Sequence, residues 1–289
     1  MKFRITADLS YRITEPATII LNILPVTRNQ LVEQENLIVD GSQQTDYPSI
    51  THDTTRYTRT LVSDPGLVSY SYSGIVENRF SVVNMVNVIQ LQVSDYPFDF
   101  LPWLYPSRYC ESDKLTKFAT HHFGKIENRF EQVTAICEWI HRNTEYVSGS
   151  TTSDTSAIHT ITQQEGVCRD FAHLGIALCR ALDIPARYCS VYAYQLVPQD
   201  FHAVFEAYIA GYWLMFDATK LAPINGFVRI CHGRDAADTA IANTFGGIEL
   251  ESMSVNSELI EGTLIPFFNE SGNFEGIAYD IGNAYQNSI

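Results

Sequence analysis

The first thirteen residues alternate between apolar and polar side chains, and this pattern constrains the fold more than any other part of the chain. An alternation with a period of two over a dozen residues indicates a β-strand with one buried face and one solvated face. Its apolar members are Phe3, Ile5, Ala7, Leu9, Tyr11 and Ile13. The chain therefore begins with a strand of a sheet that covers a hydrophobic core on one side.

Further apolar runs of strand length follow over the first hundred residues. They span residues 18–24, 31–39, 57–62, 68–76 and 86–93. Turn residues separate them, at Pro25, Asp40-Gly41, Pro48 and Asp64-Pro65-Gly66. Repeated short strands with turn signals between them favour two packed antiparallel sheets. We therefore predict an N-terminal β-sandwich-like domain over residues 1–96.

A stretch rich in proline and aromatic residues follows this domain. Pro97, Pro102 and Pro106 prevent a regular helix or a central strand, because each proline lacks a backbone donor. The stretch also carries Phe98, Phe100, Trp103 and Tyr105. Such side chains favour a packed junction over a flexible tether. Residues 97–110 are predicted to be a linker, and residues 111–289 a second domain.

The second domain combines helical and strand patterns. A helical period begins at Asn128 and runs to about residue 143, and a second begins at Cys168 and stops before Pro185. Strand patterns follow over residues 186–197, 200–209, 212–219 and 227–231, with another expected over 257–266. A helix packed against an antiparallel sheet is an α+β core.

Cys168 lies where a loop becomes the second helix, in the sequence Gly-Val-Cys-Arg-Asp. The first turn of a helix has free backbone N–H groups and the positive end of the helix dipole, which favour a thiolate and can also donate to an oxyanion. Free cysteines are, however, commonly buried as small hydrophobic residues. The position of Cys168 alone leaves both interpretations open.

His202 and Asp217 lie on two strands that the sequence predicts to form a hairpin. If the turn consists of Ala210 and Gly211 alone, Val204 faces Asp217, and His202 is its diagonal neighbour on the same face. A turn longer by one residue would separate His202 from Asp217. A single histidine near the start of a strand is often structural, so the pairing depends on the loop length.

The order of these motifs resembles the transglutaminase-like superfamily. Gly-Val-Cys-Arg-Asp, Phe-His-Ala and Phe-Asp-Ala-Thr surround Cys168, His202 and Asp217. The resemblance narrows to bacterial members with an N-terminal β domain, which are described as cysteine proteases. Supporting segments are residues 11–16, 106–110 and 233–238. Val204 departs from the pattern, because an aromatic residue is expected after His-Ala, and this affects the expected shape of the acyl-binding cleft.

The resemblance implies a transglutaminase-like or papain-like catalytic domain over residues 111–289, with a Cys168-His202-Asp217 triad. Cys168 would attack an amide, His202 would carry protons, and Asp217 would fix the imidazole tautomer. We expect hydrolysis of peptide or isopeptide bonds in a peptide or protein substrate. The alternatives are transfer of the acyl group to an amine, and a non-catalytic peptide-binding module.

For several residues near the motifs, the sequence suggests candidate or alternative roles. The Cys168 backbone N–H is one oxyanion donor, and Gln163 and Gln164 are candidates for a second. Arg169 and Asp170 are expected to be structural. The Ser/Thr-rich loop over residues 146–156 is either the rim of a cleft or a plain surface loop. Arg234 and Asp235 are either a pair that contacts substrate or, as we favour, a structural salt bridge.

Composition limits the partners and cofactors. The net charge of −14 disfavours nucleic acid and anionic membrane as partners. The expected location is the cytoplasm, since neither a signal segment nor an apolar run of about 18 residues is present. The sequence predicts no metal or cofactor, because adjacent pairs such as His121-His122 and Cys231-His232 point to opposite faces of a strand. It leaves the oligomeric state open.

Overall fold

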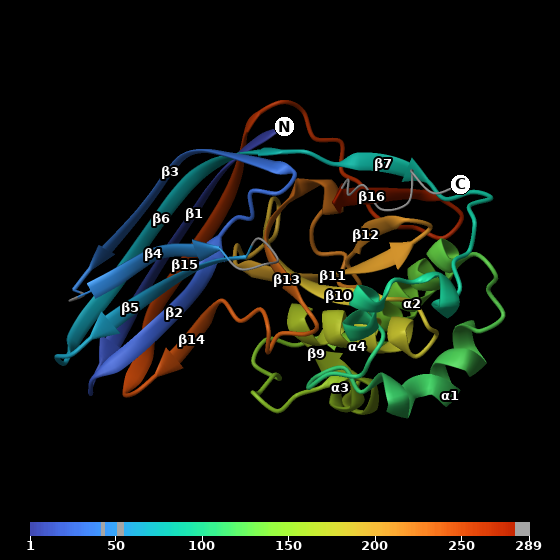
Figure 1. The fold of residues 1–289 in the computed structure, drawn as a ribbon, viewed down its shortest axis with the longest axis horizontal. Coiled ribbons are helices and arrows are strands. Elements are labelled where there is room, and N and C mark those ends of the chain that lie inside the picture. Colours follow the sequence, from blue (N-terminus) through green and yellow to red (C-terminus); the bar gives the residue numbers. More distant parts are fainter. Residues whose placement is uncertain (42–43, 51–54, 281–289) are drawn as a thin grey trace.

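The computed structural model of the protein describes residues 1–41, 44–50 and 55–280. Figure 1 shows a β-sandwich at one end of the molecule and a unit of helices and strands at the other. This is the α+β architecture that the sequence predicts, with strands first and the mixed core after them.

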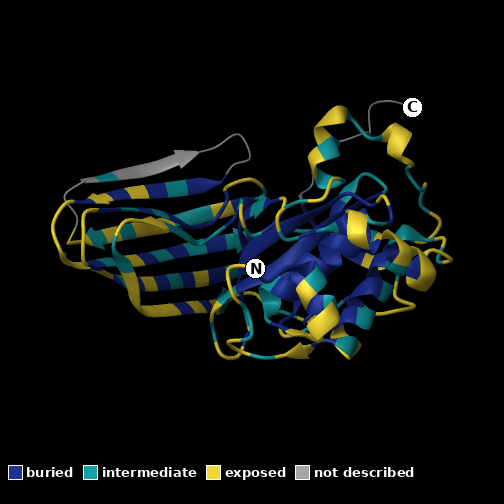
Figure 2. Cartoon of the chain, turned by 90° about the horizontal axis from the view of Figure 1, so that it is seen from below, coloured by how far each residue is buried: buried dark blue, intermediate teal, exposed yellow. Residues whose placement is uncertain are grey.

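Two four-stranded antiparallel sheets form the sandwich. The first has the order β15 (Ile248–Glu261), β1 (Lys2–Ile13), β6 (Gly66–Asn78) and β3 (Gln30–Asp40). The second has the order β14 (Ala242–Phe245), β2 (Ala17–Leu24), β5 (Arg56–Val62) and β4 (Gln44–Ile50). Burial alternates residue by residue along β1 and β5, as Figure 2 shows for the sandwich strands. The period of two in the sequence is thus the alternation between core and solvent.

The predicted strand over residues 86–93 is wrong. The strand in this region is β7 (Ser81–Asn84), and the chain after it is irregular up to the short 3-10 helix η1 (Val93–Asp95). Asn87 has a left-handed φ of 57°, and Val86 and Ile89 are exposed. A left-handed residue breaks the extended backbone, so these apolar residues cannot form one strand.

A six-stranded sheet is the centre of the second unit. Its order is β13 (Phe227–Gly233), β10 (Ala186–Ala193), β11 (Phe201–Ile209), β12 (Tyr212–Phe216), β16 (Glu275–Asp280) and β7. The helices are α1 (Ser112–Phe123), α2 (Arg129–Asn143), α3 (Ala157–Gln163) and α4 (Cys168–Arg180). A two-stranded parallel sheet of β8 (Glu145–Tyr146) and β9 (Glu165–Gly166) and a 3-10 helix, η3 (Ile224–Gly226), complete the described elements. All of β10 is buried, because apolar clusters cover both faces of the sheet.

Strand pairing crosses the predicted division at residues 96 and 111. β15 and β14 come late in the chain but complete the two sheets of the sandwich, next to β1 and β2. In the other direction, β7 leaves the N-terminal region and pairs with β16 in the central sheet. Each structural unit therefore contains strands from both parts of the sequence (Figure 1).

The predicted linker packs tightly against the central sheet. Within it, the 3-10 helix η2 (Phe98–Trp103) places the Phe100 ring 4.5 Å from the ring of Tyr208 and 5.7 Å from that of Trp213. Trp103 also lies 6.1 Å from Trp213 in an edge contact. Aromatic contacts of this kind fix the segment to the sheet and support the expectation of a packed junction.

Helix α4 lies directly on β11. A Cβ atom added to Gly175, in the middle of α4, would lie 2.5 Å from the ring of Phe205 on β11. Only glycine permits this approach. The close contact sets the height of α4 above the sheet, and with it the position of Cys168 relative to the strand that carries His202.

No helix in the part of the chain that the structure describes is both long and apolar enough to cross a membrane.

Candidate active site

Cys168 is the first residue of α4, as the sequence predicts. The Asp170 carboxylate holds the start of this helix by accepting hydrogen bonds from the Val167 backbone N–H, at 2.9 Å, and from the Thr151 hydroxyl. Asp170 is fully buried, and a Cβ on Gly166 would lie 2.7 Å from its own Cβ. The backbone N–H of Cys168 precedes the first intrahelical bond of α4 and points instead to the Tyr146 hydroxyl.

The hairpin has the register on which the pairing of His202 with Asp217 depends. Ile209 faces Tyr212 across a two-residue turn, and Phe205 faces Phe216 at the end of the ladder. Ala210 and Gly211 have φ values of 51° and 93°, the left-handed geometry of a tight hairpin turn.

Asp217 holds His202 through a buried hydrogen bond. The distance from His202 Nε2 to Asp217 Oδ2 is 2.9 Å, and both side chains are almost fully buried. The other carboxylate oxygen, Oδ1, accepts from the Thr219 backbone N–H at 2.8 Å and from the Thr219 hydroxyl at 2.7 Å. Thr219 therefore fixes the orientation of the carboxylate that in turn fixes the ring.

The environment of His202 favours its protonated form. Burial alone lowers the pKa of the imidazole, but the charge and hydrogen bond of Asp217 and the interaction with the Cys168 side chain raise the pKa to about 10, from an ordinary value of 6.5. Asp217 occupies Nε2, so Nδ1 is the ring atom left for the thiol side. The three groups can act as a thiolate–imidazolium pair backed by a carboxylate.

Tyr146 is a residue of this site that the sequence placed only in the loop over residues 146–156, without a role of its own. Burial raises the pKa of its phenol to about 12, and the charge and side-chain hydrogen bond of Cys168 add to the increase, while a hydrogen bond from the Cys168 backbone N–H opposes it. Pairing of Tyr146 with Gly166 in β8 and β9 holds the residue there. Tyr146 stands alone in a polar loop without periodicity, so no sequence pattern connects it to Cys168. The connection is its pairing with Gly166, two residues before Cys168, and that pairing appears only in the fold.

Gln163 and Gln164, the candidates for a second oxyanion donor, are both exposed at the end of α3. Gln163 ends α3, and Gln164 follows it in a left-handed conformation with a φ of 60°. Arg169 is structural, as expected. Its guanidinium donates to the carbonyls of Thr152 and Thr155 and so holds the Ser/Thr-rich loop against α4.

Val204 does not line a cleft. It is fully buried in the apolar cluster on the second face of the central sheet, with Met215 and Tyr279. Val204 can therefore affect the shape of the acyl-binding cleft only through the buried residues that it contacts. His202 and Val204 are two residues apart on one strand, so their side chains share a face. Val204 is nevertheless fully buried and has no surface open to substrate.

The expected Arg234–Asp235 pair is also corrected. Arg234 forms its salt bridge with Asp238, at 2.8 Å. Asp235 instead accepts from the backbone N–H groups of Tyr109, at 3.0 Å, and Ala237, at 2.9 Å. Both side chains are structural, and together they shape the loop over residues 234–241.

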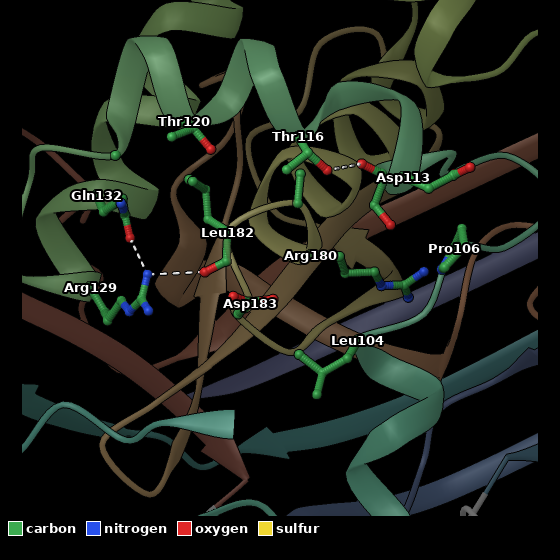
Figure 3. A pocket seen from close by; sticks show the side chains of 13 residues that line it. Leu104, Pro106, Asp113, Thr116, Thr120, Arg129, Gln132, Arg180, Leu182 and Asp183 are labelled. Atoms are coloured by element: carbon green, nitrogen blue, oxygen red, sulfur yellow. Dashed lines mark hydrogen bonds between the residues drawn. The ribbon is translucent and has the colours of Figure 1, made fainter. Parts of the chain in front are cut away.

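A cavity of about 470 Å³ lies at the other end of α4 (Figure 3). Arg180, Leu182 and Asp183 line it, whereas Cys168 is at the first residue of the same helix. Thirteen residues of helix separate the two ends by about 20 Å. In Figure 3, Arg129 is already hydrogen-bonded to Gln132 and to the Leu182 carbonyl. This cavity is separate from the candidate active site.

Both parts of the chain match known families. Residues 116–218 match the transglutaminase-like superfamily, and residues 1–94 match the N-terminal domain of bacterial transglutaminases. The fold is similar to the crystal structure of a "putative cysteine protease" from Cytophaga hutchinsonii, with a TM-score of 0.93 and 45% sequence identity. The similarity covers 96% of this chain and 97% of that one.

Curated relatives match over shorter stretches. An uncharacterised protein of Mycobacterium leprae (strain TN) is 26% identical over 145 residues, which are 47% of this chain and 52% of that protein. One of Mycobacterium tuberculosis (strain ATCC 25618 / H37Rv) is 35% identical over 81 residues, 28% of this chain and 26% of that protein. The matches thus span about half and about a quarter of these relatives. The chain matches the transglutaminase-like superfamily over residues 116–218 and resembles the Cytophaga structure over nearly all of its own length. It therefore belongs to the transglutaminase-like superfamily.

Proposed function

We propose that the protein is a cysteine hydrolase of peptide or isopeptide bonds, with Cys168, His202 and Asp217 as its catalytic triad. The observation that carries this proposal is the buried 2.9 Å bond between His202 Nε2 and Asp217 Oδ2, with Cys168 interacting with the same ring. A histidine with one nitrogen held by a carboxylate and the other free toward a thiol is arranged to exchange protons with substrate.

In the first step, the Cys168 thiolate attacks the carbonyl carbon of the scissile amide. The oxygen of the tetrahedral intermediate carries the negative charge. It takes over the hydrogen bond that the Cys168 backbone N–H gives the Tyr146 oxygen, and it accepts a second one from the Tyr146 hydroxyl, our choice for the second donor. The proton on His202 Nδ1 passes to the leaving nitrogen, the C–N bond breaks, and a thioester remains on Cys168.

In the second step, water replaces the amine. His202, now neutral, takes a proton from water, and the hydroxide attacks the thioester carbonyl. The C–S bond breaks, the acid leaves, and the thiolate–imidazolium pair forms again. Transfer to an amine is the second candidate, and the Asp200 carboxylate favours it, because this exposed group lies near His202 and Tyr146 and would attract a cationic amine.

A reactive thioester substrate with excess lysine-like amine tests this proposal. We expect mass spectrometry of the intact protein to find the acyl group on Cys168, and product analysis to find free acid in excess of the amide. A predominant amine adduct at millimolar amine would support the transferase instead. The absence of any acyl-enzyme, together with unchanged substrate, would favour the non-catalytic module.

The proposal includes a cytoplasmic location. Of the six cysteines, all within the described residues and all free, five are buried and Cys168 is half-buried. A reducing compartment would keep this accessible thiol in the reactive form.

A further inference from the structure

We propose that a cavity of about 320 Å³, whose wall includes Arg169, the residue after Cys168, binds an uncharged, apolar side chain of the substrate, on the acyl side of the scissile bond. The inference rests on the proposed function and deepens it, because it specifies the substrate that the thiol would accept. The cavity walls include Tyr109, Arg169, Tyr188, Ala236, Ala240 and Ile241.

The cavity lies on the side of the central sheet that α4 covers, and α4 begins at Cys168. Arg169, in its wall, directly follows Cys168. The wall residues Tyr188 and Ser190 lie on β10, three residues and one residue before Val191, so their side chains point to the face opposite to that of Val191 and its partner His202. Tyr188 points towards α4, where its ring lies 5.2 Å from that of His173. A group bonded to Cys168 can therefore extend into the cavity without crossing the triad.

Three hydroxyls of the wall, those of Tyr109, Ser190 and Thr239, are already engaged within the protein. The Tyr109 hydroxyl donates to the Ser153 carbonyl at 3.0 Å, and the Ser190 hydroxyl donates to the Thr239 carbonyl at 3.3 Å. The Thr239 hydroxyl donates to the Asp235 carbonyl at 3.1 Å. These three donors are not left for a ligand, so rings and methyl groups provide most of the contact surface. A polar side chain would lose its hydration without replacement there.

The charge at the cavity disfavours ionic side chains. The Arg169 guanidinium lies 4.3 Å from the centre of the Tyr109 ring and 4.0 Å from the buried Asp170 carboxylate. It would repel a cationic side chain directly. A carboxylate would gain little, because Asp170 already offsets the charge, and it would still have to lose its hydration.

One wall of the cavity is held in place from behind. His173 Nε2 accepts from the Ala236 backbone N–H at 3.1 Å, and Arg180 donates to the Arg234 carbonyl at 2.7 Å. Burial keeps His173 neutral by lowering its pKa well below the ordinary value, with Arg169 and Arg180 contributing, so Nε2 is available as an acceptor. A preformed wall selects a side chain without the entropic cost of ordering a loop.

The test uses covalent probes that differ in one side chain. Capped aminoacyl acyloxymethyl ketones of Ala, Leu, Phe, Lys and Glu are reacted with the full chain, and the rate of labelling at Cys168 is followed by intact mass. We expect the Leu or Phe probe to react roughly tenfold or more faster than the Ala, Lys and Glu probes, since apolar contacts in such a pocket discriminate by that order.

Two variants locate the preference. Ala240→Phe fills the cavity, and we expect the ratio of Leu to Ala rates to fall to about one. Ala237→Phe, on the same loop but outside the cavity wall, is the matched control and should keep the wild-type ratio. Ile241→Ala enlarges the cavity and should shift the preference from Leu to Phe, so the test holds even if Ala240→Phe does not fold.

The outcomes separate this inference from the proposed function. Equal labelling rates for all probes, or an unchanged ratio of Leu to Ala rates in both cavity variants, would overturn the inference. Rapid alkylation of Cys168 by iodoacetamide at pH 6 in the same protein would still support the triad. Slow alkylation at pH 6 together with slow labelling by every probe would overturn both.

Discussion

Among single residues, Tyr146 most needs a direct test of its role, which is to donate a hydrogen bond to the oxyanion. Removal of an oxyanion donor lowers kcat without a matching change in KM, because the bond strengthens only in the transition state. We predict that Tyr146→Phe lowers kcat roughly 100-fold. The control is Tyr105→Phe, which removes the hydroxyl of an exposed tyrosine and should leave kcat unchanged. A change in KM as large as the fall in kcat, or an unchanged kcat, would remove Tyr146 from the mechanism.

Asp217 controls the protonation of His202. Because the Asp217 charge raises the pKa of His202, Asp217→Asn should lower that pKa and move the alkaline loss of activity to lower pH. In the wild type, the protonated form persists until the pH rises through about 10. We also expect kcat to fall roughly 100-fold, since proton transfer contributes at that order. A kcat profile against pH checks both, and an unmoved alkaline limb would contradict the assignment.

At the scale of elements, the contact of α4 with β11 holds the triad together. Gly175→Ala at an exposed helix position would stabilise the protein by about 1 kcal/mol. Here the added methyl group meets the Phe205 ring, so we predict a loss of about 1–3 kcal/mol in the free energy of unfolding. Urea titration measures it. Slower alkylation of Cys168 should accompany the loss, and a gain in stability would show that α4 does not rest on β11 as described.

The elements that the sequence predicted are those with a clear period. The alternation in residues 2–13, the helix after Asn128 and the helix that begins at Cys168 all carry it, and the structure confirms them. The helices α1 and α3 were not predicted, because α3 has only seven residues and the helical spacing of Leu115, Ala119 and Phe123 in α1 was overlooked. β16 lies in an irregular, glycine-containing region whose strand depends on its partners β7 and β12.

The geometry around the candidate site was predictable only in part. At the two-residue turn, Gly211 is a sequence signal because glycine adopts a left-handed backbone without cost, but the left-handed φ of 51° at Ala210 is unusual for a residue with a Cβ and required the structure. The contact of Tyr146 with Cys168 and the orientation of Asp217 by Thr219 arise from segments that meet only in the fold. No local sequence pattern predicts contacts between such distant segments, so these contacts could be identified only in the structure.

At the scale of the whole molecule, the two units depend on each other. β14 and β15 come from the C-terminal half and pair with β2 and β1, and β7 crosses the other way. We therefore predict that a fragment of residues 97–289 does not fold alone, because it loses the partners of three strands and exposes unpaired edges. A cooperative thermal transition by circular dichroism, with rapid alkylation of Cys168, would contradict this.

The thiolate–imidazolium pair is the central claim, and the pH dependence of Cys168 alkylation tests it most directly. The wild type should react with iodoacetamide rapidly at pH 6, at Cys168 before Cys110 or Cys231, while His202→Ala should react slowly at that pH and recover only at alkaline pH. His121→Ala, which removes an exposed histidine, is the control and should match the wild type. An unchanged profile in His202→Ala, or preferential labelling of Cys110 or Cys231, would contradict the account.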